Sequence, residues 1–148
     1  MSELSISLEW NLQEDELKPE SFSKNHKIEI NNNKFNAGSA PDYGGKENEL
    51  NPEQSLAASI SSCHMMTFLA LAAKMNWPVS GYTDNAIATL GKNSKGKMSV
   101  TNIELNPKIA FSNEFSVDEN KMKEVQERAH RYCFIANSLS DEVKVKIN

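Results

Sequence analysis

The sequence predicts an α+β fold with antiparallel sheets, in a single domain spanning residues 1–148. Two observations carry this prediction. Short segments with alternating apolar residues lie toward both ends of the chain, and an uncharged run occupies residues 54–73. The expected order is strands, long helix, hairpin, helix and strand. Because strands and helices do not alternate regularly, a doubly wound parallel sheet is not expected.

Three strands are predicted before the uncharged run. In residues 4–10, leucine, isoleucine and tryptophan alternate with polar residues, which is typical of a half-buried strand. Residues 26–30 form a second short strand, the asparagines at 31–33 favour a turn, and Phe35 begins a third strand. Residues 37–49 contain three glycines and a proline, which predicts a loop leading to the central helix.

The central helix has clear signals at both ends. Asn51 is a favourable N-cap, Pro52 suits the first helical position, and Glu53 lies at the positive end of the helix dipole. Alanine, leucine and methionine dominate the run that follows, and these residues favour helix. The helix should end near Asn76, because Pro78 follows shortly after.

A hairpin is predicted after the helix. Residues 82–90 alternate, residues 91–97 are polar and begin at a glycine, and residues 98–105 form the return strand, which Ile109 and Phe111 extend.

A second helix and a last strand complete the chain. Ser116 should open the helix, with Glu119 completing a capping box. The apolar positions that follow are spaced as on one helical face. Residues 134–139 form one further turn, and residues 142–147 alternate as a final strand.

Composition excludes several partners. Hydrophobic residues make up 39% and charged residues 24%, with a net charge of −4, so neither nucleic acid nor an anionic membrane is expected. Four serines and other polar residues dilute the uncharged run, which argues against a membrane span. The N-terminus shows no secretory signal pattern, so we expect a cytoplasmic protein whose two cysteines are thiols.

The two cysteines, Cys63 and Cys133, allow three interpretations. Free cysteines are commonly buried as small hydrophobic residues. Alternatively, the fold brings them together as a redox pair, in which a thiolate becomes a sulfenic acid and then a disulfide. A zinc site with His64 and His130 is a third reading. It is disfavoured because adjacent residues on a helix diverge by about 100° and the usual paired spacings are absent.

Several segments together resemble the OsmC/Ohr family, the osmotically inducible and organic hydroperoxide resistance proteins. They are NPEQSLAASISSCHMMTFLALAAK, AHRYCFIANSL, FSKNH and GKNSKGKMSVTNIEL. The resemblance also includes the first predicted strand, which contains Trp10, and the last predicted strand, which is rich in valine. FSKNH and CHMM resemble the OsmC-like branch. The resemblance implies two central helices packed between antiparallel sheets, an intertwined homodimer with active sites at the subunit interface, and thiol-dependent reduction of organic hydroperoxides to alcohols.

The resemblance also implies roles for single residues. Cys63 matches the peroxidatic cysteine, Cys133 the resolving cysteine, and Glu53 the glutamate that holds the family's catalytic arginine. That arginine is missing here, since both arginines of the chain lie on the second predicted helix. Lys24 in FSKNH is the candidate for its position. A lysine ammonium supplies a point charge, but it lacks the planar guanidinium with which an arginine can hydrogen-bond two partners at once.

The expected reaction needs an apolar access route and a reductant. We expect Met65, Met66, Phe68 and Phe134 to line the route of an alkyl or fatty-acyl hydroperoxide to Cys63. The resemblance suggests a lipoyl-type dithiol as the external reductant, and no metal or organic cofactor is expected. The alternative is a non-enzymatic dimer of the same fold that binds an apolar ligand. The missing arginine favours this alternative.

Overall fold

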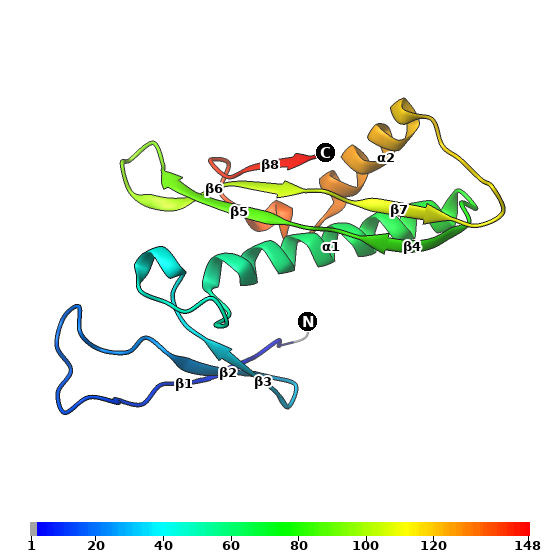
Figure 1. The fold of residues 1–148 in the computed structure, drawn as a ribbon. Coiled ribbons are helices and arrows are strands. Elements are labelled where there is room, and N and C mark those ends of the chain that lie inside the picture. The colour runs from blue at the N-terminus through cyan, green and yellow to red at the C-terminus, as the bar shows by residue number, and fades with distance from the viewer. Residues whose placement is uncertain (1–2) are drawn as a thin grey trace. The chain divides into compact units, whose positions relative to one another are not determined.

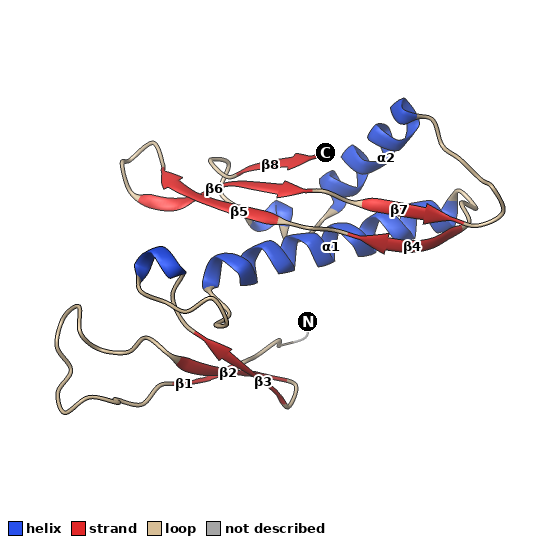
Figure 2. Ribbon diagram, viewed as in Figure 1, coloured by secondary structure: helices blue, strands red, loops and turns tan. Residues whose placement is uncertain are grey.

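The computed structural model describes residues 3–148, and the chain divides into two compact units. The N-terminal unit comprises residues 1–55 and the C-terminal unit residues 56–148. Each unit contains its own antiparallel strand pairs, and both major helices extend into or lie within the C-terminal unit (Figures 1 and 2). The predicted α+β class is confirmed.

The N-terminal unit contains the three predicted strands as one antiparallel sheet. Strands β1 (Ser7–Glu9), β2 (His26–Ile30) and β3 (Asn33–Ala37) pair in the order β1-β2-β3. Asn31 and Asn32 join β2 to β3 with left-handed φ angles of 49° and 66°, which asparagine tolerates. The predicted asparagine turn is therefore confirmed.

The prediction of a half-buried strand at residues 4–10 is only partly correct. Pairing is confined to Ser7–Glu9, and Leu4, Ile6 and Leu8 are 92%, 55% and 59% exposed. Within the N-terminal unit, the three-stranded sheet does not cover these side chains. Period-two alternation therefore identified the strand but not whether its apolar residues are buried within one chain.

Helix α1 (Pro52–Lys74) begins as predicted. The backbone N–H of Gln54 donates to Asn51 Oδ1 at 2.8 Å, and the N–H of Asn51 donates to Gln54 Oε1 at 3.1 Å, which is a reciprocal capping box. At the other end Asn76 adopts a left-handed φ of 56°, and the N–H of Trp77 returns to the carbonyl of Ala72 at 2.9 Å. Both predicted helix ends are confirmed to within two residues.

Helix α1 is apolar around its whole circumference. By length and composition it meets the requirement for a membrane span, yet only 28% of its most hydrophobic 18-residue window is buried within this chain. A helix that is apolar on all sides is normally covered on all sides. The chain therefore leaves much of α1 without cover.

The C-terminal unit contains two sheets. Strand β4 (Val79–Thr83) pairs antiparallel with β7 (Lys108–Phe111), while β5 (Ile87–Lys92), β6 (Met98–Leu105) and β8 (Lys144–Ile147) form a three-stranded sheet in the order β5-β6-β8. The β5–β6 hairpin is antiparallel as predicted, but β6 and β8 are parallel. Antiparallel pairing therefore describes every named strand pair except this one.

The single strand predicted at residues 82–90 is wrong, because the chain breaks into β4 and β5 at Asp84. The Asp84 carboxylate accepts hydrogen bonds from the Ser61 hydroxyl of α1 at 2.5 Å and from the Asn106 N–H at 2.6 Å. These bonds turn the Asp84 side chain toward α1 and interrupt the ladder. Hydrogen bonds from residues distant in sequence to this carboxylate therefore overrode the alternating pattern.

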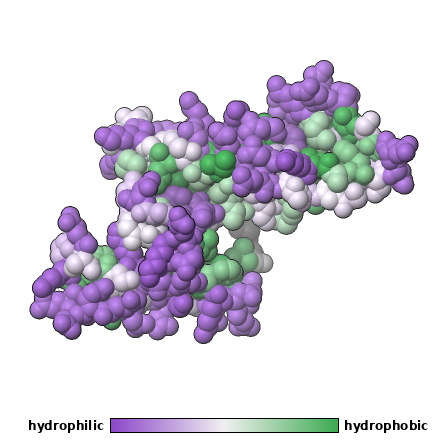
Figure 3. Space-filling view, in the orientation of Figure 1, coloured by the Kyte–Doolittle hydropathy of each residue, from purple (hydrophilic) through white to green (hydrophobic). Residues whose placement is uncertain are grey.

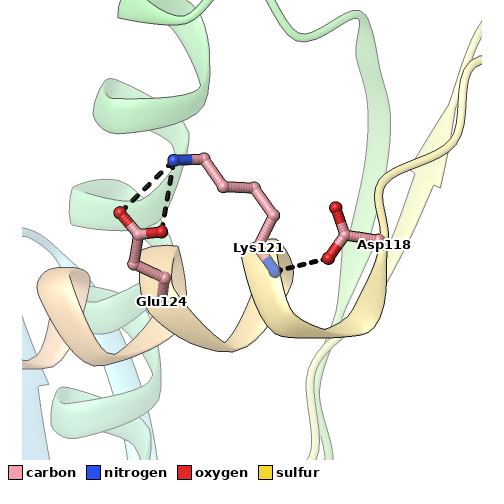
Figure 4. Close-up of polar contacts among 3 residues, drawn as sticks. All are labelled: Asp118, Lys121 and Glu124. Atoms are coloured by element: carbon pink, nitrogen blue, oxygen red, sulfur yellow. Dashed lines mark hydrogen bonds and ion pairs between the residues drawn. The ribbon is translucent and has the colours of Figure 1, made fainter.

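Helix α2 (Glu119–Tyr132) begins later than predicted. Asp118, not Ser116, is the N-cap, and its Oδ1 accepts from the Lys121 N–H at 2.9 Å (Figure 4). The Lys121 ammonium also contacts the Glu124 carboxylate at 3.3 Å across one turn. Aspartate is at least as favourable an N-cap as serine, so the helix begins after Asp118 and not after Ser116. The turn predicted at residues 134–139 is confirmed as the short 3₁₀ helix η2 (Ala136–Ser138).

Two apolar clusters form the core of the C-terminal unit, and both include α1. One joins α1 to α2 and consists of Phe68, Ala72, Val125 and Ala129. The other joins α1 to β6 and consists of Ile60, Ile103 and Leu105. Elsewhere apolar side chains reach the surface over the strands of this unit (Figure 3). Cys63 thus lies on the stretch of α1 between its two buried anchors.

Candidate functional site

The structure brings the two cysteines together. Cys63 lies in the middle of α1 and Cys133 at the C-cap of α2, and the two thiols are close enough for each to shift the pKa of the other. Both are free thiols. The fold therefore supplies the contact that a redox pair needs and that sequence spacing cannot show.

Packing between the two helices explains this contact. Phe68 and Ala72 on α1 pack with Val125 and Ala129 on α2, one turn or more from the two cysteines. Cys133 leaves the helix with extended φ and ψ angles of −72° and 114°, where the chain turns toward η2. The core cluster thus brings the end of α2 to the middle of α1.

The Cys63 thiol is the more acidic of the two. Burial raises its pKa, but hydrogen bonds from the Cys133 thiol, the peptide N–H groups of Ile135 and Phe134, and the Thr67 side chain together hold the pKa below its ordinary value. The thiolate is the nucleophilic form of cysteine. Cys63 is therefore the thiol of the pair that more readily loses its proton.

Cys133 has the opposite character. Its side chain is completely buried, and burial first, then the neighbouring Cys63, raises the pKa of this thiol to about 11. The N–H of Ala136 donates to its sulfur at 3.4 Å. At neutral pH Cys133 therefore keeps its proton and donates it toward Cys63.

His64, next to Cys63 in sequence, points elsewhere. Its ring is completely buried, and Nε2 lies 2.6 Å from Oε1 of Gln126 on α2. Burial lowers the pKa of His64, the Gln126 bond raises it, His130 lowers it and Asp84 raises it, with a net shift downward. A neutral ring that donates to Gln126 links α1 to α2, which is a positioning contact.

No group of three or more His, Cys, Asp and Glu side chains in residues 3–148 is placed to hold a metal ion. His64 bonds to Gln126 while Cys63 bonds to Cys133, so the two adjacent residues diverge, as expected for neighbours on a helix. The zinc arrangement weighed from the sequence therefore has no support in the geometry.

Lys24 and Glu53, the predicted cation and its partner, both belong to the N-terminal unit. The Lys24 ammonium donates to the Tyr43 carbonyl at 3.3 Å, and no ion pair joins it to Glu53 within the described chain. Glu53 Oε2 is buried and has no hydrogen-bond partner among the described residues. A buried carboxylate oxygen without a donor is costly, so this position calls for one.

Lys24 is held beside an apolar groove. Asn25 donates to the buried carboxylate of Glu49 at 3.0 Å and to Asn36 Oδ1 at 2.6 Å, which anchors the FSKNH segment to β3. The groove has a volume of about 720 Å³. Its walls are Leu8, Trp10, Leu17, Lys18, Pro19, Phe22, Lys24 and His26. The predicted cation thus borders a largely hydrocarbon surface.

The four residues expected to line the substrate route lie in different environments. Met66 and Phe134 are 58% and 82% exposed, and Met65 is half-buried. Phe68 is completely buried and packs in the core cluster between α1 and α2. We therefore correct the assignment of Phe68, which is a core residue, and keep Met65, Met66 and Phe134 as candidates.

Sequence reasoning missed the hydrogen-bonding groups around the two sulfurs. Thr67 lies one turn after Cys63, a spacing that puts both on one helix face and was open to prediction. Gln126 had no such signal, because its partner His64 is distant in sequence. Backbone donors at Phe134 and Ile135 carry no sequence signal, since every residue except proline has an N–H.

Comparison with known proteins identifies the family of this chain. The family model described as OsmC-like protein matches residues 44–148. A solved OsmC-like protein of unknown function from Vibrio cholerae O1 biovar eltor is 38% identical over 100% of both chains, with a TM-score of 0.88. OsmC of Legionella pneumophila, an organic hydroperoxide resistance protein, is 16% identical with a TM-score of 0.72, covering 99% of this chain and 97% of that chain.

OhrB of Bacillus subtilis, also an organic hydroperoxide resistance protein, is 18% identical with a TM-score of 0.70, covering 99% of this chain and 97% of that chain. No curated protein matches. The two hydroperoxide resistance proteins share the fold, while the family model and the Vibrio protein also share the sequence pattern. By fold and by sequence, this chain belongs to the OsmC-like family.

Proposed function

We propose that this protein is a cysteine-based peroxidase that reduces organic hydroperoxides to alcohols. The observation that carries the proposal is the contact between Cys63 and Cys133, in which one thiol is made more acidic and the other less. That asymmetry supports Cys63 as the nucleophile and Cys133 as the resolving thiol. The fold is shared with solved organic hydroperoxide resistance proteins, which supports the same reaction class.

The first step is oxidation of Cys63. Its thiolate attacks the distal oxygen of the hydroperoxide, an S–O bond forms, and the O–O bond breaks. The attacked oxygen keeps its hydrogen on sulfur, and the leaving alkoxide takes a proton from solvent and becomes the alcohol. Cys63 is left as a sulfenic acid, having lost two electrons to the peroxide.

The second step closes the disulfide. Cys133 attacks the Cys63 sulfur, an S–S bond forms, and the sulfenic oxygen leaves as water with the Cys133 proton. Oxidation removes the negative charge from Cys63, and this removes the electrostatic repulsion that helps to raise the pKa of Cys133. An external dithiol, for which we propose a lipoyl-type compound, then returns two electrons and two protons.

Lys24 and Glu53 are proposed as the charged pair of the site. The unpartnered buried oxygen of Glu53 calls for a donor, and Lys24 is the cation that the family resemblance suggests. In this proposal Glu53 orients the ammonium and the ammonium favours the Cys63 thiolate. The groove beside Lys24 and the exposed Met66 and Phe134 support an apolar alkyl or fatty-acyl hydroperoxide as substrate.

A second copy of this chain is the proposed partner. Helix α1 is apolar on all sides but only partly covered, and Leu4, Ile6 and Leu8 are exposed, so apolar surface in both units lacks cover within one chain. An intertwined homodimer would supply that cover. We place the protein in the cytoplasm, where two thiols stay reduced between catalytic cycles.

The test is a count of free thiols after mixing the reduced protein with cumene hydroperoxide. We expect both thiols to be lost and the alcohol to form in equal amount to the disulfide. Cys63→Ser should abolish both, whereas Ser62→Ala, a change one residue away at an exposed position, should not. Thiols that remain intact under excess peroxide would exclude a peroxidase.

A non-enzymatic dimer that binds an apolar ligand is the second candidate. The bond from Lys24 to the Tyr43 carbonyl, in place of an ion pair with Glu53, is the observation that favours it. A fluorescent fatty acid that binds equally well to wild type and to Cys63→Ser, together with intact thiols under peroxide, would select this candidate. If the protein is a peroxidase, dihydrolipoamide should reduce its disulfide faster than glutathione does.

A further inference from the structure

A buried hydrogen bond joins α1 to α2 at the residue that follows Cys63. The His64 ring is completely buried, Gln126 is 6% exposed, and Nε2 of His64 lies 2.6 Å from Oε1 of Gln126. An amide oxygen can only accept, so Nε2 carries the proton and donates it. Among residues 3–148, the amide nitrogen of Gln126 donates only to the sulfur of Met122, at 3.9 Å. Breaking this bond would leave two buried polar groups unpaired, which is strongly unfavourable.

The bond lies between two apolar contacts that hold α2 and the turn after it along α1. On one side, the cluster that joins α1 to α2 begins at Phe68, one turn after His64. On the other side, Ile135 and Ala136 pack against the cluster that contains Ile60, one turn before His64. Along the chain, each of the two cysteines lies between these two apolar contacts. The bond is therefore the polar contact between the helices nearest to Cys63 in sequence.

The polar contact constrains the helices in a way that apolar packing does not. Apolar burial is non-directional, so it brings α1 and α2 together but leaves small rotations and slides open. A hydrogen bond is directional and weakens steeply when it is bent. Because Cys63 precedes His64 on the same helix, a fixed His64 ring also fixes the direction of the Cys63 side chain relative to α2. The two thiols lie close enough for each to shift the pKa of the other.

We propose that His64 and Gln126 are positioning residues for the disulfide, and that their hydrogen bond sets how readily Cys63 and Cys133 join. A disulfide needs a narrow range of Cα separations and Cβ directions. A misplacement of about 1 Å between reacting groups can cost about a hundredfold in rate. The inference rests on the proposed peroxidase, because closing this disulfide is its second step. Both residues act through the two cysteines and take no part in the chemistry.

The test is the equilibrium of the whole protein with glutathione buffers in the absence of peroxide. As the Cys63–Cys133 disulfide forms, the two thiols pass two electrons and two protons to oxidised glutathione, which becomes two thiols. Gln126→Met keeps the side-chain length without the acceptor, and His64→Phe keeps a ring without the donor. We expect each variant to lower the equilibrium constant for disulfide formation about tenfold, the upper range for one lost hydrogen bond.

The double variant and a distant core variant make the test specific. Gln126→Met combined with His64→Phe should lower the constant no further than either change alone, because the same bond is lost once. Phe111→Ala is the control for stability, since Phe111 packs against Trp77 with ring centroids 6.1 Å apart and lies outside both core clusters. It should unfold at lower urea concentration yet keep the constant within about twofold, because the reduced and oxidised forms are destabilised alike.

Two results of this experiment would overturn the proposal. One is a wild-type constant in folded Gln126→Met and His64→Phe. The other is a tenfold fall in Phe111→Ala, which would mean that the constant follows general stability.

A measurement on the unmodified chain covers the outcome in which the buried variants do not fold. In protein labelled with ¹⁵N-histidine, the ring nitrogen signals report which nitrogen carries the proton. We expect a neutral His64 ring with the proton on Nε2 in both the reduced and the disulfide form, because a positioning bond persists when the disulfide closes. A His64 ring with its proton on Nδ1 in either form could not donate to Gln126 from Nε2 and would contradict the proposal.

These readouts are separate from the peroxidase test. The glutathione equilibrium and the ring signals are measured without peroxide, so they can fail while cumene hydroperoxide still consumes both thiols. In that outcome the peroxidase stands, and His64 and Gln126 do not position its cysteines. Thiols that survive peroxide, with the tenfold effects present, would instead reject the proposed function and leave the positioning role intact.

Discussion

The two helices that carry the cysteines differ in how their apolar and charged residues are distributed. Helix α1 is uncharged between Gln54 and Ala73 and apolar on every side, whereas α2 has one apolar face and a charged face. Each places one thiol in the same contact. The Cys63 thiol on α1 has a lowered pKa, and the Cys133 thiol at the end of α2 has a pKa raised to about 11.

The difference shows that burial alone does not determine the character of a thiol. Burial raises the pKa of both cysteines, and the hydrogen bonds decide the outcome. Cys63 receives donors from Cys133 and from the turn after it. Cys63 loses its proton before Cys133 does, and the resulting negative charge opposes a second one on Cys133. The helix that looks more hydrophobic therefore carries the more acidic thiol.

Removing one thiol at a time should produce the largest effect. In Cys133→Ala, Cys63 loses a donor but keeps its nucleophilic sulfur, so cumene hydroperoxide should consume one thiol and yield a sulfenic acid that excess peroxide oxidises further. Turnover with dihydrolipoamide should fall by orders of magnitude. Mass spectrometry checks the added oxygen atoms. Cys63→Ser is the contrasting variant, in which Cys133 should stay unoxidised under the same conditions.

Two phenylalanines distinguish the core of α1 from the rim of the site. Phe68→Ala removes a completely buried ring and should lower the free energy of unfolding by about 3–5 kcal/mol. Phe134→Ala changes an 82% exposed side chain, and its effect on stability should stay within about 0.5 kcal/mol. Urea unfolding measures both. Equal losses would mean that Phe134 is buried in the assembled protein, which would sharpen the case for a second copy.

The start of α2 allows a smaller test of stability. Asp118→Ala removes the side chain that accepts the Lys121 N–H and should cost about 1 kcal/mol. Ser116→Ala, the cap expected from the sequence, should cost almost nothing. Thermal or urea unfolding of the two variants side by side decides the matter. A larger loss of stability in Ser116→Ala than in Asp118→Ala would mean that Ser116 is the N-cap.

The smallest expected effect is a pH dependence of the free energy of unfolding, which arises at the contact between His64 on α1 and Gln126 on α2. Burial holds the pKa of His64 below its ordinary value, so the native ring stays neutral while the unfolded chain takes up a proton below about pH 6.5. Stability should therefore fall as the pH drops from about 6.5 toward the native pKa. His64→Gln should lose that part of the slope in urea unfolding between about pH 7 and pH 5. A slope identical to wild type would show that His64 does not titrate.

Local signals predicted much of the fold. The cap at Asn51, the left-handed Asn76 and the asparagine turn are each specified by a few neighbouring residues, so a sequence pattern finds them. The predictions failed where distant groups compete. Asp84 divides a predicted strand because it binds Ser61 on α1, and β8 pairs with β6 in parallel. Neither partner can be read from the local pattern.

By itself the sequence determined the helix that carries Cys63, the resemblance around Cys133, and the restriction of both arginines to the segment of α2. These are properties of residue identity and short spacing. Only the tertiary structure decided that the two thiols lie close enough to shift each other's pKa, that Phe68 belongs to the core, and that the Ala136 N–H donates to Cys133 Sγ. The physical reason is that contacts between α1 and the end of α2 depend on packing across distant segments, and backbone donors are the same in every sequence.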